Sequence, residues 1–150
     1  MYQVFVISIA KPIQIGLYEN YKLVKIYDAE GKSSDILPSV LKSILKEYDI
    51  NEIYYVNSPG SYMAIKVAYV FLKTLCIVKD INFFASFGFH FNENSPIKAL
   101  GKKYFFYKNN EITIDFLHKE STIAQFLLPK VLNTKLFSKN TLPIYNLPAV

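Results

Sequence analysis

Residues 53–75 read IYYVNSPGSYMAIKVAYVFLKTL, and this stretch decides the fold. Its first four residues are apolar or aromatic, which is typical of a buried strand. In the turn that follows, Gly60 permits a sharp bend and Ser61 can cap a helix. Residues 62–75 then predict a helix that is apolar on nearly its whole circumference, because only two lysines and one threonine interrupt it. Such a helix needs cover on two sides, and because the chain's own sheet can cover only one, the other predicts a partner.

The residues around this stretch predict an α/β fold. Three strand-like runs come first, at residues 2–9, 13–18 and 21–27, and their short connections favour an antiparallel meander. Apolar residues then recur at helical spacing over residues 36–48, with Ser34 or Asp35 as the expected cap. Two strand–helix–strand transitions, ending in strands at residues 53–56 and 81–84, predict a layer with parallel crossovers.

The second half of the sequence has a less regular pattern. Residues 85–91 and 121–132 are expected to form short helices, the latter capped by Ser121. Three strands are expected at residues 97–100, 103–107 and 112–117. The proline-containing tail, residues 141–148, is too apolar for a free linker and is expected to lie against the body.

The composition limits the class of protein. The chain has 150 residues, of which 51% are hydrophobic, and one cysteine, which excludes an internal disulfide framework. No run reaches the length of a membrane span, and the first ten residues lack the basic region of a signal peptide, so we expect a cytoplasmic protein without membrane contact. The net charge is +5, but the lysines are dispersed, which argues against dedicated nucleic-acid binding by this chain alone. Neither His90 nor His118 has a second ligand at metal-binding spacing, so no metal site is expected.

The motif loop between the strand and the helix has two interpretations. It consists of Ser58, Pro59, Gly60 and Ser61. Backbone amides before a helix can bind an anion, but the loop lacks the lysine and the full glycine pattern of a phosphate-binding loop. A structural turn and cap is the favoured interpretation.

Several of these motifs resemble the TsaB (YeaZ) family. Residues 58–66 are similar to its Gly-Pro-Gly-Ser-Phe-Thr-Gly-Leu-Arg signature, which also follows a strand and opens a helix. Ile36-Leu37-Pro38 resembles the Leu-Leu-Pro start of the family's first helix. Leu142-Pro143-Ile144-Tyr145 resembles a segment near the family's C-terminus. The resemblance covers residues 2–86 well and residues 87–140 thinly.

The resemblance implies a fold and a role. The fold is the actin, sugar-kinase and Hsp70-like one, an RNase H-like mixed sheet with flanking helices, here in residues 1–86, with a reduced second lobe and a tail that packs back in residues 87–150. TsaB proteins are non-catalytic subunits that bind and stabilise TsaD, with TsaE as a further component, in the threonylcarbamoyladenosine modification of tRNA. The chain itself is then expected to hold no cofactor, although ATP or ADP can belong to the TsaD complex, and it meets tRNA through the complex.

Departures from the family pattern reduce the case for catalysis. The first strand ends in Ser8-Ile9-Ala10 where the family has Asp-Thr-Ser, so an acid is missing. Residues 32–35 lack the family's histidine, and no aspartate lies near residues 99–101. A glycoprotease-like hydrolase is the enzymatic alternative, and these losses argue against it.

The helix of residues 62–75 is the expected partner surface, because the resemblance implies that the first two helices form the TsaB–TsaD contact. The expected contact residues are Tyr62, Ala64, Ile65, Ala68, Tyr69 and Leu72, with Leu37 and Leu41 from the first helix. Ala64 and Ala68 are small residues four apart, which lets another helix approach closely. For each of these side chains, packing inside the monomer is the alternative. A homodimer through the same helix is a further possibility.

Overall fold

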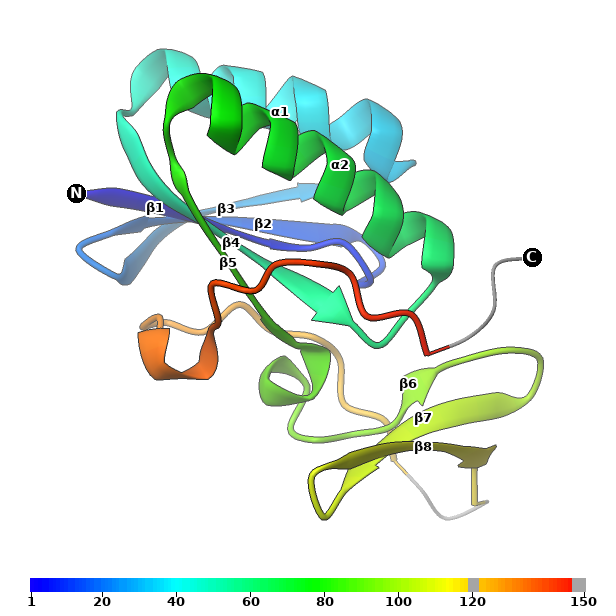
Figure 1. The fold of residues 1–150 in the computed structure, drawn as a ribbon. Helices are drawn as coiled ribbons and strands as arrows, with labels where there is room; N and C mark the ends of the chain where they lie inside the picture. Colours follow the sequence, from blue (N-terminus) through cyan, green and yellow to red (C-terminus); the bar gives the residue numbers. More distant parts are fainter. Residues whose placement is uncertain (119–121, 147–150) are drawn as a thin grey trace.

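The structure, a computed structural model, describes residues 1–118 and 122–146 and contains two sheets (Figure 1). A five-stranded sheet has the order β3-β2-β1-β4-β5, and a three-stranded sheet has the order β6-β7-β8. The strands of the first sheet are β1 (Tyr2–Ile7), β2 (Ile13–Glu19), β3 (Lys22–Ala29), β4 (Ile50–Ser58) and β5 (Asn82–Phe87). The first three strands are antiparallel neighbours, whereas β1, β4 and β5 are parallel. The predicted meander and parallel crossovers are therefore confirmed.

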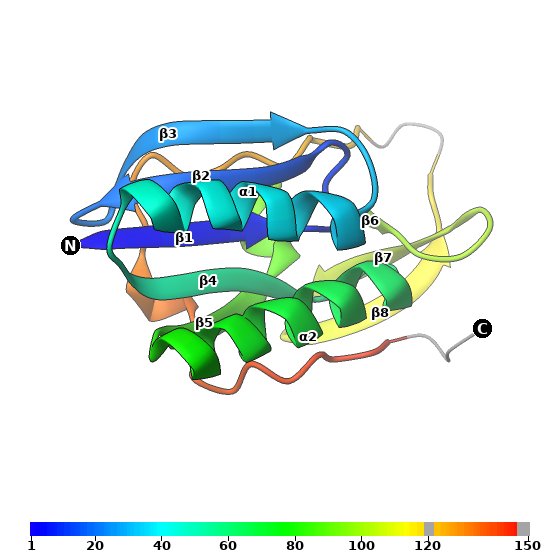
Figure 2. The ribbon, with the colours of Figure 1, turned by 90° about the horizontal axis from the view of Figure 1, so that it is seen from above.

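Two helices cover one face of this sheet. Helix α1 (Ser33–Glu47) connects β3 to β4, and α2 (Tyr62–Lys79) connects β4 to β5. They lie side by side above the strands (Figure 2). Both bury an apolar stripe against alternate residues of β1, β2 and β4, such as Val6, Ile15 and Tyr55, because successive strand residues point to opposite faces.

The opposite face of the sheet is covered without a long helix. Residues 122–138 return beneath it as extended chain, interrupted by the short 3₁₀ helix η2 (Thr134–Leu136), and residues 139–146 then run past the β5 edge toward the start of α2 (Figures 1 and 2). Single bridges join Lys22 to Val131 and Ala85 to Ser138, so this segment contacts both edge strands. Leu128 and Leu132 pack into a second core cluster with Phe5 and other residues of the central strands.

The smaller sheet lies below the main body. It consists of β6 (Ile97–Lys98), β7 (Lys103–Lys108) and β8 (Glu111–Phe116), which are antiparallel. Phe105 of β7 is fully buried against Phe89 and Ile97. The proposed division of the chain at residue 86 stays a prediction.

Three local expectations need correction. Residues 122–132, the described part of the expected helix 121–132, are not helical, and the expected cap Ser121 lies outside the described residues. Pro129 interrupts the helical pattern, and the backbone instead bonds to neighbouring strands, as Leu23 N–H does with the Lys130 carbonyl at 2.9 Å. Within the expected helix 85–91, β5 continues to Phe87 and only η1 (Gly88–Phe91), a 3₁₀ turn, follows. Helix α1 begins at Ser33 after Lys32, so neither Ser34 nor Asp35 caps it.

Candidate partner-binding surface

The inner face of α2 belongs to the monomer core. Ile65, Ala68 and Leu72 are fully buried, and Cys76 continues the same stripe one turn further. Ala68, Leu72 and Cys76 pack into the cluster beneath the two helices. The small side chain of Ala68 therefore lets α2 approach its own sheet, and these three predicted contact residues are not accessible to a partner.

The two predicted contact residues of α1 also belong to the monomer core. Leu37 and Leu41 are fully buried in the cluster that joins α1 to the sheet. They are spaced four residues apart, so they share one side of the helix, and that side faces inward. The structure thus realises the monomer-packing alternative for five of the eight predicted residues.

The other three predicted residues are half-buried at the flanks of α2. The rings of Tyr62 and Tyr145 lie 4.4 Å apart between centroids, which places the tail beside the start of the helix. The carbonyl of Ala64 accepts a hydrogen bond from Ser8 Oγ at 3.4 Å. Tyr69 packs against the core, with its ring centroid 6.4 Å from that of Tyr55. Each has a contact within the monomer and keeps part of its surface open.

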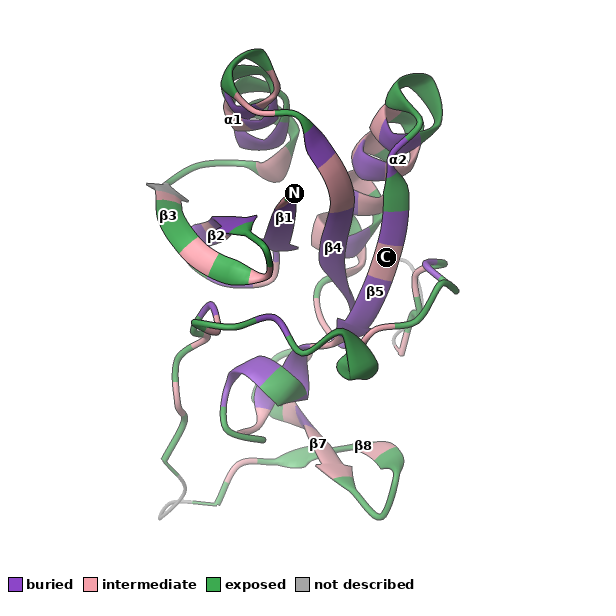
Figure 3. Cartoon of the chain, turned by 90° about the vertical axis from the view of Figure 1, so that its left-hand side faces the viewer, coloured by how far each residue is buried: buried purple, intermediate pink, exposed green. Residues whose placement is uncertain are grey.

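A second apolar stripe on α2 faces solvent. Met63, Val70 and Ile77 have exposed fractions of 60%, 53% and 70%, and they are spaced seven residues apart along one line of the helix. Val78 is exposed beside them. Figure 3 shows the contrast, with buried residues of α2 toward the sheet and exposed residues on its outer side. We call Met63, Val70, Ile77 and Val78 the outer stripe. The sequence analysis did not predict these residues, although the seven-residue spacing of Met63, Val70 and Ile77 indicates a common side of the helix.

The motif loop is a structural turn held by the C-terminal tail. Asn57 Nδ2 donates to the Leu142 carbonyl at 3.0 Å, and Ser58 Oγ donates to Asn146 Oδ1 at 3.3 Å. Ser61 occupies the N-cap position of α2, but its side chain makes no capping hydrogen bond. A Cβ on Gly60 would lie 2.5 Å from Ile9 Cγ2, so a side chain there has no room. Close packing against Ile9, rather than an unusual backbone angle, requires glycine at this position.

A cavity of about 580 Å³ lies where the N-terminal ends of α1 and α2 meet the turn after β1. Its walls are mainly apolar and include Pro12, Met63 and Val67. Ser8, at the end of β1, lines it and uses its hydroxyl in the bond to Ala64. A serine hydroxyl supplies no carboxylate for a hydrated metal ion or for general-base chemistry at this position.

The ionisable groups near the core have ordinary structural explanations. Burial raises the pKa of the Cys76 thiol to about 12. Burial also raises the pKa values of the Tyr18 and Tyr55 hydroxyls, and it lowers the pKa of His90. Within residues 1–118 and 122–146, no three or more His, Cys, Asp or Glu side chains gather as a metal site would require. None of the helices in this part of the chain has the length and apolar character needed to cross a membrane.

The fold has relatives among solved structures. No protein-family model matches the chain, and no curated protein matches it. YeaZ from Pseudomonas aeruginosa superposes with a TM-score of 0.55 at 9% identity, over 83% of this chain and 67% of that one. A structure described as an uncharacterized protein with similarity to peptidase YeaZ, from the same organism, gives a TM-score of 0.54 at 10% identity, over 76% and 63%.

At sequence identities of 9% and 10%, the two similarities show a shared fold. The matched part spans about two thirds of the length of those two chains, 67% and 63%. The predicted α/β fold, with a mixed sheet and flanking helices, is confirmed. The chain therefore has a YeaZ-like fold, as the resemblance of its motifs to the TsaB family predicts.

Proposed function

We propose that this chain is a TsaB-like, non-catalytic subunit that binds and stabilises TsaD through the outer surface of α1 and α2. In this proposal it acts in the cytoplasm, in the complex that makes threonylcarbamoyladenosine in tRNA, with TsaE as a further component. ATP or ADP and tRNA are bound by the complex, and no residue of this chain is assigned to either.

The outer stripe is the observation that carries the proposal. The inner faces of α1 and α2 need no partner protein, because their apolar residues are already buried against the sheet. Met63, Val70, Ile77 and Val78 are nevertheless apolar and exposed on the other side of α2. Exposed apolar residues gathered along one helix face mark an interaction site more often than scattered ones do. The YeaZ-like fold and the motif before α2 together favour TsaD as the occupant.

The contact residues differ from those expected from the sequence alone. The outer stripe replaces Ile65, Ala68, Leu72, Leu37 and Leu41, which are buried. Tyr62, Ala64 and Tyr69 keep partly open surface and remain candidates at the edge of the contact.

The test is co-purification with the TsaD of the same organism, using the wild type and Val70→Glu. A charge in the centre of an apolar contact loses its hydration on binding, so we expect Val70→Glu to weaken binding at least a hundredfold. Val24→Glu is a matched control, because Val24 on β3 is 54% exposed and Val70 is 53% exposed. Circular dichroism should show both variants folded.

Two results would reject the proposal. Equal TsaD binding by Val70→Glu and Val24→Glu would place the contact elsewhere. Hydrolytic turnover by the pure isolated chain, retained after a second purification, would contradict the non-catalytic role.

A further inference from the structure

The charges on α2 have one sign. The helix contains Lys66, Lys73 and Lys79 and no acidic residue. Lys66 and Lys73 are seven residues apart, so they form a row beside the outer stripe, which has the same spacing. The Lys66 ammonium lies 5.5 Å from the centre of the Tyr62 ring, which places it at the flank of the helix away from α1.

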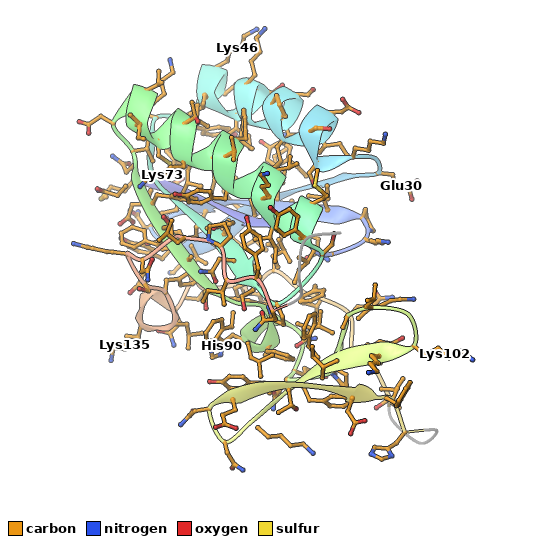
Figure 4. The ribbon with its side chains drawn as sticks, turned by 45° about the vertical axis from the view of Figure 1, so that its right-hand side comes forward. Glu30, Lys46, Lys73, His90, Lys102 and Lys135 are labelled. Atoms are coloured by element: carbon orange, nitrogen blue, oxygen red, sulfur yellow. The ribbon has the colours of Figure 1, made fainter. Side chains whose placement is uncertain are left out.

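Helix α1 supplies basic residues on the other flank. A groove of about 350 Å³ separates the helices, and it is lined by apolar residues that include Leu45, Phe71 and Leu75. Lys42 and Lys46 of α1 line the same groove. Lys46 projects outward from α1 and Lys73 lies on α2 (Figure 4). Lysines from two helices therefore border the apolar surface on both sides.

We propose that this surface fits a partner helix whose apolar stripe is flanked by carboxylates, and that it is built against pairing with a second copy of this chain. The inference rests on the proposed function for the identity of the natural partner, but its charge rule applies to any helix that docks here. Complementary charges at the edge of an apolar contact fix the partner and raise the association rate, and like charges exclude the wrong partner.

Self-pairing through α2 places like charges together. In a twofold antiparallel pair centred on Val70, position 66 of one copy faces position 74 of the other. Lys66 then lies next to Lys73 of the second copy, and the symmetry repeats this contact. Helix α2 offers no carboxylate to neutralise either pair. Burial of the outer stripe would favour a homodimer, whereas repulsion between the lysines beside it opposes one.

The shape of the surface favours a protein over an anionic membrane. A helix that lies in a lipid interface buries a broad apolar face in the bilayer. Here the broad face of α2 is buried in the monomer core, and only the outer stripe and the groove beside α1 remain. A groove between helices accepts the projecting side chains of another helix.

The inference is tested with a variant of the chain in which the charge of two lysines is reversed. We would measure self-association of the wild type, of the Lys66→Glu/Lys73→Glu double variant, and of their equimolar mixture by sedimentation velocity. The mixture juxtaposes glutamates and lysines across the same stripe, so we expect it to associate at least tenfold more tightly than either protein alone. This preference should shrink as salt is raised, because exposed charges are screened. Lys98→Glu/Lys108→Glu, which reverses two exposed lysines of the small sheet, is the control and should give no such preference.

The outcomes separate this inference from the proposed function. Wild-type self-association as tight as that of the mixture, or no association of the mixture at millimolar concentration, would overturn the inference, whether or not TsaD binds. In the TsaD assay, Lys66→Glu/Lys73→Glu should weaken binding at least tenfold at low salt. If Val70→Glu abolishes TsaD binding and the lysine reversal leaves it unchanged, the proposed function stands and the charge rule fails. Binding of the wild type to phosphatidylglycerol vesicles, lost in the double lysine variant, would also overturn it in favour of a membrane.

Discussion

The two faces of the five-stranded sheet are covered in different ways. On one face, α1 and α2 supply a regular layer whose apolar residues recur at helical spacing. On the other face, residues 122–138 supply extended chain that is tied down at separate points, such as the Tyr18 hydroxyl bond to the Pro129 carbonyl at 2.7 Å. Both faces have fully buried side chains, so an irregular cover excludes water as completely as a helical one. The extended cover also exposes apolar side chains, such as Leu127 and Val131. The difference is that on α2 the helical repeat places Met63, Val70 and Ile77 along one line, whereas extended chain gives its exposed residues no such line.

The largest expected effect comes from placing a charge under the helical cover. Ala68→Glu would bury a carboxylate at a fully buried site with apolar neighbours. We expect a loss of about 4 kcal/mol or more in the free energy of unfolding, because the charge has no partner there. Chemical denaturation followed by circular dichroism measures it, with Thr74→Glu on the exposed side of the same helix as the control. A stable Ala68→Glu protein would mean that α2 is not seated on the sheet as described.

Truncation of one leucine on each face compares the two covers directly. Leu72 lies on the inner face of α2, and Leu132 lies in the extended cover. Removing a buried leucine side chain costs roughly 2–5 kcal/mol, depending on how far the site can relax. We expect Leu72→Ala to fall near the upper end and Leu132→Ala near the lower end, because an extended segment can shift more easily than a packed helix. Urea unfolding of both variants measures this, and a negligible effect of Leu132→Ala would show that the extended cover is loosely attached.

The helical face could be predicted from the sequence, and the extended face could not. Alternating or helically spaced apolar residues have a fixed geometric meaning, so residues 36–48 and 62–75 predicted their elements correctly. The extended cover has no such period. Phe126, Leu128 and Leu132 mimic a helical pattern, but their partners include residues more than a hundred positions away, as in the Gln14 side-chain bond to the Phe126 carbonyl at 2.8 Å. Such pairing depends on the tertiary fold.

The sequence placed the expected partner contact on a side of α2 that the structure shows to be buried, and a partner contact on this helix stays a prediction. Because α2 is apolar on both sides, the sequence showed that two covers are needed without showing which stripe faces the sheet. The spacing of Ala64 and Ala68 fits close approach to a partner or to the chain's own sheet, and the structure shows the second for Ala68. The seven-residue spacing that Lys66 and Lys73 share with Met63, Val70 and Ile77 could have indicated this outer side of the helix.

A smaller effect is expected from one hydrogen bond of the extended cover. Tyr18→Phe removes the donor to the Pro129 carbonyl and leaves the ring in place. The expected loss is about 1 kcal/mol, typical of a single hydrogen bond whose acceptor can find water. Tyr104→Phe on the small sheet is a suitable control. A loss several times larger would mean that this bond anchors the whole segment rather than one residue of it.

The smallest expected effect on stability at neutral pH concerns Cys76, on the inner face of α2 near its C-terminal end. Burial raises the pKa of its thiol to about 12, against roughly 8.5 for a free cysteine. The folded state thus retains the proton more strongly than the unfolded state, so this contribution to stability is complete below about pH 8.5 and is lost as the pH rises toward 12. A disulfide reagent at pH 8 should modify Cys76 in the native protein only as fast as the helix opens, and should modify it at once in urea. Ala68→Glu should remove this protection, whereas Leu132→Ala, on the opposite face, should leave most of it. Equal loss in both variants would show that the two covers unfold as one unit, and rapid reaction of the native wild type would contradict the tight seating of α2.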